Sequence, residues 1–158
     1  MAEKIILLAD DDIDDREMFC EALEKIDNRI ACTCVVNGSD LLRKLEALPE
    51  HPQLIFLDLN MPVMNGWDCL KQLKEDARYK DIPVIMISTS SNQPGTDRAA
   101  NLGALCYFVK PHNFNALTSL LKSIVANLGP GLVDAMHKLQ YTSDYIFIVN
   151  DGNDIDKN

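Results

Sequence analysis

Four short apolar runs of the chain each end in a side chain that can do chemistry. The runs and the residues that follow them are Ile5–Ala9 with Asp10, Asp11 and Asp12, Leu54–Leu57 with Asp58, Val84–Ile87 with Ser88, and Cys106–Val109 with Lys110. Short continuous apolar runs are typical of strands that are buried on both faces of a parallel sheet. Because the carboxyl ends of such strands face the crevice where ligands bind, we expect these acids, the hydroxyl and the amine to line one pocket.

The acids of this pocket would repel one another unless something neutralises them. Two unit charges about 4 Å apart, at an effective dielectric near 20, raise the energy by about 4 kcal/mol. Either one carboxyl group takes up a proton or a cation binds between them, and Mg²⁺ suits a site made of a few carboxylate oxygens. Lys110 adds a positive charge beside Asp58, and Ser88 adds a hydroxyl donor. Such a set can hold the negative charge of a phosphoryl group during its transfer, so the residues predict a site for a divalent cation and a phosphoryl group.

Strand-like and helix-like patterns alternate along the chain and would hold these side chains in place. Strands are predicted at Ile5–Ala9, Ile30–Val36, Leu54–Leu57, Ile82–Ile87 and Cys106–Val109. Apolar residues at helical spacing predict one helix after each strand, and these helices begin near Asp14, Ser39, Gly66, Gly95 and Phe114. Five strand–helix units in a row predict an α/β fold, with a doubly wound five-stranded parallel sheet and helices on both faces.

The sequence Gly129-Pro130-Gly131 marks a boundary after the last of these helices. We expect a domain over residues 1–128 and a C-terminal extension over 129–158 that holds a short helix and the strand-like Tyr145–Val149. This segment is too apolar to leave in water, and a strand of this kind can add to another sheet. We therefore expect it to support a homodimer or to cap the last helix. The polar Asp151–Asn158 is predicted to be disordered.

The composition limits the classes of partner. The chain has 158 residues, enough for one domain, and 15 Lys and Arg residues against 24 Asp and Glu residues give a net charge of −9. An acidic surface repels phosphate backbones, which argues against DNA or RNA as the partner. No apolar run approaches the roughly 20 residues that span a bilayer, and no signal peptide is evident. We expect a cytoplasmic protein with no membrane contact.

The five cysteines are interpreted as small buried hydrophobic residues in a reducing compartment. Cys32 and Cys34 have the spacing of a metal pair only at first sight. They lie in a β-branched stretch, and the chain offers no second Cys or His pair at a usable spacing. A zinc site is therefore not expected.

The residues at the strand ends resemble the receiver domain of bacterial two-component response regulators. The matching blocks are Ile-Leu-Leu-Ala-Asp10-Asp11-Asp12, Leu57-Asp58-Leu-Asn-Met-Pro62, Met86-Ile-Ser88-Thr89 and Tyr107-Phe-Val-Lys110-Pro111, in the order and spacing of that family. The resemblance covers residues 4 to about 128. It implies a flavodoxin-like fold with strand order 2-1-3-4-5.

The resemblance also implies a role for each pocket residue. Asp58 would accept a phosphoryl group from a histidine kinase or a histidine phosphotransfer protein. Asp11, Asp58 and the backbone carbonyl of Asn60 would bind Mg²⁺, and Asp10 would act through water. Lys110 would contact the phosphoryl oxygens, Ser88 would hydrogen-bond the phosphoryl group, and Tyr107 would rotate inward in response. The family's Lys-Pro bond is usually cis, so a cis Lys110-Pro111 bond is expected.

Some positions depart from the commonest pattern of the family. Thr89 stands where a small alanine often lies beside the pocket mouth, and its bulk would restrict entry or slow phosphoryl loss. Ser90 and Asn60, which flank the path of the hydrolytic water, are both uncharged. His112 follows Lys-Pro where a phenylalanine is more usual. These residues do not predict how long a phosphorylated state would last.

The residues after Pro130 contain no basic cluster and no recognition-helix pattern, so we expect a stand-alone receiver that signals through protein contacts and is not a turnover enzyme. Two alternatives belong to other classes. A haloacid-dehalogenase-type phosphatase needs a second Asp two residues after its nucleophile, and Asn60 stands there. A degenerate receiver would bind a partner without phosphorylation but would lack one of the key residues, and all are present.

Overall fold

The computed structural model describes residues 4–89 and 93–147, which form one α/β sheet structure. The strands are β1 (Lys4–Ala9), β2 (Ile30–Val35), β3 (Leu54–Asp58), β4 (Val84–Ser88), β5 (Cys106–Val109) and β6 (Ile146–Phe147). Their order in the sheet is β2-β1-β3-β4-β5-β6. The first five strands are parallel, and β6 pairs antiparallel with β5. The predicted parallel sheet of order 2-1-3-4-5 is confirmed, and the sixth strand is a small addition at its edge.

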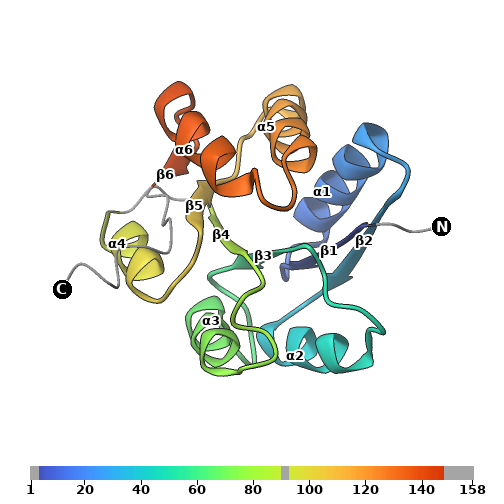
Figure 1. The fold of residues 1–158 in the computed structure, drawn as a ribbon, viewed down its shortest axis with the longest axis vertical. Helices are drawn as coiled ribbons and strands as arrows, with labels where there is room; N and C mark the ends of the chain where they lie inside the picture. Colours follow the sequence, from blue (N-terminus) through green and yellow to red (C-terminus); the bar gives the residue numbers. More distant parts are fainter. Residues whose placement is uncertain (1–3, 90–92, 148–158) are drawn as a thin grey trace.

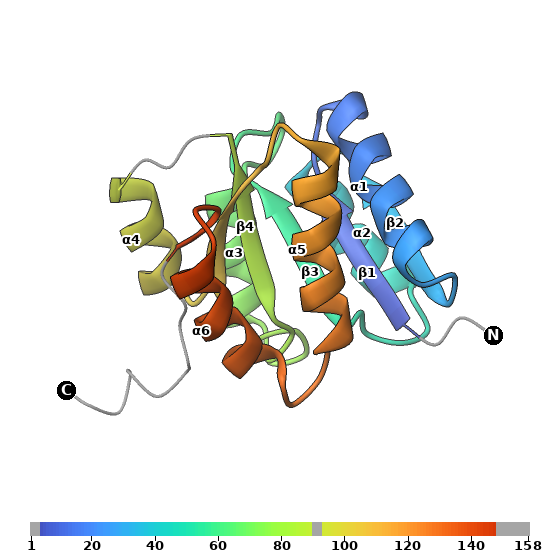
Figure 2. The same ribbon diagram turned by 90° about the horizontal axis from the view of Figure 1, so that it is seen from above.

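Helices of the described residues cover both faces of this sheet (Figure 1). They are α1 (Ile13–Ile26), α2 (Gly38–Ala47), α3 (Gly66–Glu75), α4 (Gln93–Asn101), α5 (Phe114–Ala126) and α6 (Leu132–Thr142). Figure 2 shows α1, α5 and α6 on one face and α2 and α3 behind the sheet. Two apolar cores result: Phe19, Leu121 and Met136 belong to the first, and Leu41, Leu70 and Ala99 of α4 belong to the second.

Polar N-caps fix where the helices begin. The side chains of Asp12, Asn37, Asn65 and Asn113 accept hydrogen bonds from backbone N–H groups in the first turns of α1, α2, α3 and α5. A cap of this kind satisfies donors that have no partner inside the helix. At α1, Oδ1 of Asp12 accepts from the backbone N–H groups of Asp14 and Asp15, so the helix begins close to the predicted Asp14.

The C-terminal residues that the structure describes pack against their own chain. Leu132 and Met136 of α6 and Ile146 of β6 are buried in the same core as α1 and α5. The backbone N–H of Val109 in β5 also donates to the carbonyl of Tyr145 at 2.8 Å. The segment expected to be disordered, Asp151–Asn158, lies outside the described residues. In the part of the chain that is described, no helix has the length and apolar character needed to cross a membrane.

The prediction of a cis bond between Lys110 and Pro111 is wrong. No peptide bond among the described residues is cis. The trans form of an X-Pro bond is favoured by about 0.5–1 kcal/mol unless the surroundings oppose it. With a trans bond after Lys110, the lysine side chain still points into the pocket that is described below.

Candidate functional site

The ends of four parallel strands bring the predicted pocket residues to one edge of the sheet. Asp58 is the last residue of β3 and pairs in register with Ile87, and Ser88 is the last residue of β4 and pairs with Val109. Asp10 follows β1 directly, and Lys110 follows β5. The backbone N–H of Lys110 donates to the carbonyl of Ser88 at 2.8 Å, which ties the two strand ends together.

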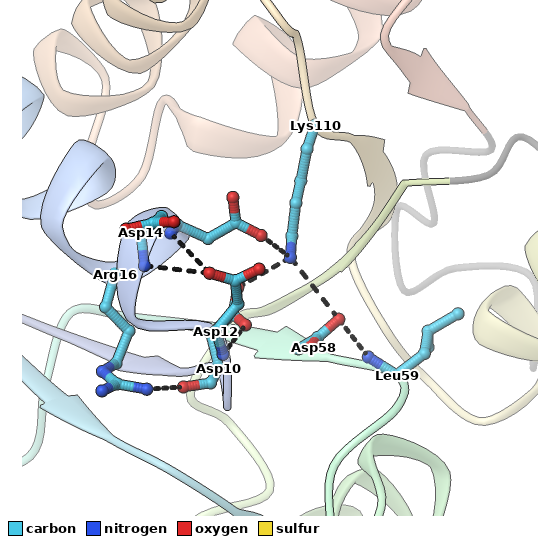
Figure 3. Close-up of polar contacts among 8 residues, drawn as sticks. Asp10, Asp12, Asp14, Arg16, Asp58, Leu59 and Lys110 are labelled. Atoms are coloured by element: carbon cyan, nitrogen blue, oxygen red, sulfur yellow. Dashed lines mark hydrogen bonds and ion pairs between the residues drawn. The ribbon is translucent and has the colours of Figure 1, made fainter.

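Lys110 joins the acids of the pocket (Figure 3). Its Nζ lies 2.7 Å from Oδ2 of Asp10, 2.7 Å from Oδ2 of Asp15 and 3.8 Å from Oδ1 of Asp58. Only 7% of the lysine side chain is exposed, and Asp10 is completely buried. Burial lowers the pKa of Lys110, but the hydrogen bonds to Asp10 and Asp15 outweigh this effect and the pKa is raised. The amine therefore stays charged inside the pocket.

Three carboxylates face one another around this amine. Asp10, Asp11 and Asp58 each place an oxygen within 4.8 Å of the others, and Asp11 is the exposed member. Burial raises the pKa of Asp58 to about 7, against the opposing charge of Lys110 and with further upward contributions from Asp10 and Asp11. The charge of Lys110 therefore does not offset the cost of ionising a buried carboxyl group beside two other acids. Oxygen ligands that converge in this way, with one side open to solvent, fit a hard divalent cation.

Backbone contacts hold the two buried acids in position. Oδ1 of Asp10 accepts from the backbone N–H of Asp12 at 3.0 Å, and the carbonyl of Asp10 accepts from Nη1 of Arg16 at 2.7 Å. Oδ1 of Asp58 accepts from the backbone N–H of Leu59 at 2.9 Å. These bonds orient both carboxyl groups before any ligand binds.

Gly66 supports Asp58 from behind. A Cβ atom at this position would lie 2.2 Å from the carbonyl oxygen of Asp58 and 3.0 Å from Cα of Leu59. The backbone N–H of Gly66 donates to the carbonyl of Leu59 at 2.9 Å, so the start of α3 lies directly on the chain that follows β3. Only a residue without a side chain permits this approach.

The remaining predicted residues differ in burial. Ser88 is buried at the end of β4, whereas Asn60 and Thr89 are exposed in the loops that follow β3 and β4. Tyr107 is 1% exposed, and its hydroxyl oxygen would lie 3.5 Å from a Cβ atom at Gly95 of α4. The ring is thus already inward in this structure. Ser90 lies outside the described residues.

Sequence reasoning missed Asp15 and Gly66. From the sequence alone, Asp14 and Asp15 are equally good candidates for a contact with Lys110. The Asp12 cap fixes where α1 begins, and this helix phase turns Asp15 toward Lys110. That phase offers a signal, because neighbouring helix positions differ by about 100° and only one can face the pocket. For Gly66 no local pattern exists, since its neighbour Asp58 is eight positions away in the loop.

The chain matches the model of the response regulator receiver domain over residues 6–122, so it belongs to this family. A protein-glutamate methylesterase/protein-glutamine glutaminase of Clostridium acetobutylicum is 35% identical over 130 residues, which are 80% of this chain and 36% of that protein. The chain spans 56% of a phosphate regulon transcriptional regulator of Pseudomonas aeruginosa, to which it is 30% identical. It therefore covers about a third to a half of the length of these curated relatives.

Solved structures agree with this assignment. The phosphorylated cyanobacterial phytochrome response regulator RcpA has a TM-score of 0.74 and 31% identity, and the match covers 80% of this chain and 94% of that one. The Mn²⁺-bound form of the response regulator Rcp1 has a TM-score of 0.66 and 28% identity over 78% of this chain and 92% of that one. The protein is thus a receiver domain of two-component signal transduction, a signalling module.

Proposed function

We propose that Asp58 accepts a phosphoryl group from a phosphohistidine of a histidine kinase or a histidine phosphotransfer protein, and that the chain then signals through protein contacts. The observation that carries this proposal is the pocket itself: a buried carboxyl group at the end of β3, with Nζ of Lys110 3.8 Å away and two further carboxylates beside it. The phosphorylated relative RcpA supports it.

The transfer needs one nucleophile and much charge neutralisation. A carboxylate oxygen of Asp58 attacks the phosphorus, the P–N bond to the donor imidazole breaks, and the imidazole nitrogen takes a proton from solvent. An ammonium group has three donors, and hydrogen bonds to Asp10 and Asp15 use two of them. The third can serve an oxygen of the phosphoryl group that joins Asp58, because these oxygens carry the negative charge of the incoming group.

We propose Mg²⁺ as the cofactor of this step, held by Asp11 and Asp58 with the backbone carbonyl of Asn60, and by Asp10 through water. The grouping of Asp10, Asp11 and Asp58 supports the proposal, as does the Mn²⁺-bound relative Rcp1. A divalent cation lowers the charge that the phosphoryl oxygens and the three carboxylates would otherwise bring together.

We propose that Ser88 and Tyr107 transmit the effect of Asp58 phosphorylation to the protein surface. Ser88 would donate its hydroxyl hydrogen to the phosphoryl group. Tyr107 is the second residue of β5 and lies next to Gly95, so a shift of its ring would change its contact with α4. The surface formed by α4 and β5 is therefore the proposed route from the pocket to a downstream protein.

Exposed apolar side chains near the pocket support a protein as donor. Ile13 is 58% exposed two positions after Asp11, and Val63 is 85% exposed in the loop that follows β3. With a net charge of −9, neither nucleic acid nor an acidic membrane surface is a favourable partner. We propose that the protein works in the cytoplasm, where its free cysteines would stay reduced.

We also propose that the C-terminal segment forms a homodimer contact. Ile146 is used in the protein's own core, so any such contact would involve the outer edge of β6 and the exposed face of α6, where Tyr141 is 85% exposed. Light scattering on the full chain and on Tyr141→Asp tests this. A dimer that the substitution dissociates supports the contact, and a monomer at all concentrations contradicts it.

Intact-protein mass after incubation with acetyl phosphate and Mg²⁺ tests the phosphoacceptor. We expect a labile phosphoryl-sized gain in the native chain that requires Mg²⁺, and no gain in Asp58→Asn. Asp144→Asn, an exposed acid outside the pocket, is the matched control and should be modified like the native chain. A gain that persists in Asp58→Asn would contradict the proposal. If neither acetyl phosphate nor a histidine kinase modifies the native chain, the protein is a receiver that binds partners without phosphorylation.

A further inference from the structure

Three cysteines that are separate in sequence meet on the face of the sheet that α1 covers. Sγ of Cys20 lies 2.9 Å from Sγ of Cys32 and 2.8 Å from Sγ of Cys34, and the latter two sulfurs are 3.9 Å apart. Cys20 belongs to α1, and the other two lie two positions apart on β2, so their side chains point to the same face. The sequence offered only the pair on β2, and the helix supplies the third thiol.

The geometry points to a metal site: we propose that Cys20, Cys32 and Cys34 bind one thiophilic d¹⁰ cation such as Zn²⁺ or Cu⁺. The three thiols are grouped closely enough to share one ion, with Sγ atoms within 4.8 Å of one another. Zn–S bonds of about 2.3 Å in a tetrahedral site place the sulfurs about 3.8 Å apart, and Cys32 and Cys34 already have this spacing. The Cys20 sulfur, which lies 2.9 Å and 2.8 Å from the other two, would move back by roughly 1 Å to bind the ion. Three thiolates select a soft cation over Mg²⁺.

The surroundings of the sulfurs favour this use. The three residues are partly buried, whereas Cys69 and Cys106 are fully buried, so an ion can reach only the first group. A cation that binds there would displace the thiol protons.

Three sulfurs leave the fourth position of a tetrahedral site to another ligand. Glu24 lies one helical turn after Cys20 on α1, it is exposed, and its charge acts on the Cys20 sulfur. This carboxylate or a water molecule would complete a tetrahedral site. The site would be separate from the acidic pocket, because its ligands lie within α1 and β2 and not at the strand ends.

A disulfide is the competing use of these thiols. It would join only two of them, and a sulfur–sulfur bond of about 2.05 Å requires Cys20 to move toward one partner and away from the other. A cation is favoured because the Cys20 sulfur lies equally close to both sulfurs of β2, whereas a disulfide uses only one of them.

Co²⁺ is the probe that tests this proposal, because a thiolate ligand gives it an intense charge-transfer absorption that carboxylates do not. The reduced full chain is titrated with Co²⁺ in excess Mg²⁺, which fills the acidic pocket. We expect one equivalent of Co²⁺ to produce this absorption and the visible bands of a tetrahedral site, and Zn²⁺ to displace it.

The variants Cys20→Ser and Cys34→Ser should each weaken Co²⁺ binding at least tenfold. Cys69→Ser, a fully buried thiol outside the cluster, is the control and should bind as the native chain does. Circular dichroism on each variant shows that it is folded. The proposal is overturned if the reduced native chain gives no charge-transfer band, or if the band survives in Cys20→Ser. A Cys20–Cys34 or Cys20–Cys32 disulfide in the air-exposed chain, with no metal bound after reduction, would also overturn it.

Discussion

The environment of Asp58 disfavours its ionised form, whereas its proposed role requires that form. Its carboxyl group is buried beside Asp10 and Asp11, which makes ionisation costly, yet a phosphoacceptor must be ionised to attack. Lys110 lowers this cost only in part, because two of its hydrogen bonds go to Asp10 and Asp15. The pocket without a cation is therefore a destabilised part of the protein, and its stability should depend on the charge of one residue.

Asp58→Asn should stabilise the Mg²⁺-free protein at pH 8. The pKa of Asp58 is raised from 3.8 to about 7, so between these values the folded state binds more protons than the unfolded state and stability falls as pH rises. Each unit corresponds to about 1.4 kcal/mol, and we expect a gain of about 1–3 kcal/mol in the free energy of unfolding. At pH 5 the gain should be less than half as large, and it should vanish only below pH 3.8, where both states carry the proton.

Urea unfolding in a chelator at both pH values measures this effect. Mg²⁺ at pH 8 should stabilise the native chain and leave Asp58→Asn nearly unchanged. The exposed Asp144→Asn should stay within about 0.5 kcal/mol of the native chain at both pH values. Equal stability of the native chain and Asp58→Asn at pH 8 without Mg²⁺ would mean that the acids do not repel one another as described.

At the scale of elements, the loop between β3 and α3 depends on a contact that no local pattern shows. The chain turns back so tightly that the N-terminus of α3 touches the carbonyl of Asp58. Gly66→Ala should therefore force the backbone of the phosphoacceptor to move. We expect a loss of about 2–3 kcal/mol in stability and weaker Mg²⁺ binding.

Thermal unfolding and a Mg²⁺ titration followed by the emission of Trp67, the chain's single tryptophan, test the Gly66→Ala variant. Gly131→Ala is its control, because the nearest atom to a Cβ there is 3.7 Å away. If Gly66→Ala binds Mg²⁺ as tightly as the native chain, the contact does not position Asp58.

The elements themselves could largely be predicted, and their mutual contacts could not. Continuous apolar strands and helical spacing gave the five strand–helix units, because the period of a pattern depends only on neighbours in sequence. The grouping of Asp15 with Lys110, of Gly66 with Asp58 and of Cys20 with Cys34 depends on how distant elements pack. Helix phase gives a signal for Asp15 alone, and no pattern in the sequence indicates the other two contacts.

The C-terminal helix shows the same limit, since its spacing was evident but its packing partner was not. Met136 of α6 is completely buried in the core that α1 and α5 share. Met136→Ala should lower the free energy of unfolding by about 2–5 kcal/mol, whereas Tyr141→Ala, whose side chain is exposed, should change it by less than about 0.5 kcal/mol. Urea unfolding measures both. An unchanged stability in Met136→Ala would show that α6 is not part of the folded core.

At the scale of the whole molecule, the net charge of −9 adds a long-range field to the local acids of the pocket. A divalent cation is attracted by every acidic residue within a screening length, which falls from about 30 Å at 0.01 M salt to about 8 Å at 0.15 M. Part of the affinity for Mg²⁺ should therefore come from residues that never touch the ion. Salt screens distant charges more strongly than adjacent ones. A KCl titration can therefore separate the contribution of distant acidic residues to Mg²⁺ affinity from that of the pocket acids.

Mg²⁺ binding should weaken roughly threefold or more between low and physiological KCl, as measured by titration of Trp67 emission. A variant with two distant reversals, Asp134→Lys and Asp144→Lys, removes four units of negative charge without altering the pocket. It should bind Mg²⁺ more weakly than the native chain at low salt, and the difference should shrink as KCl rises. A neutral osmolyte at matched osmolality should leave the affinity unchanged. If the native chain and the double variant bind equally at low salt, the affinity arises from Asp10, Asp11 and Asp58 alone, and the acidic surface serves the choice of partner instead.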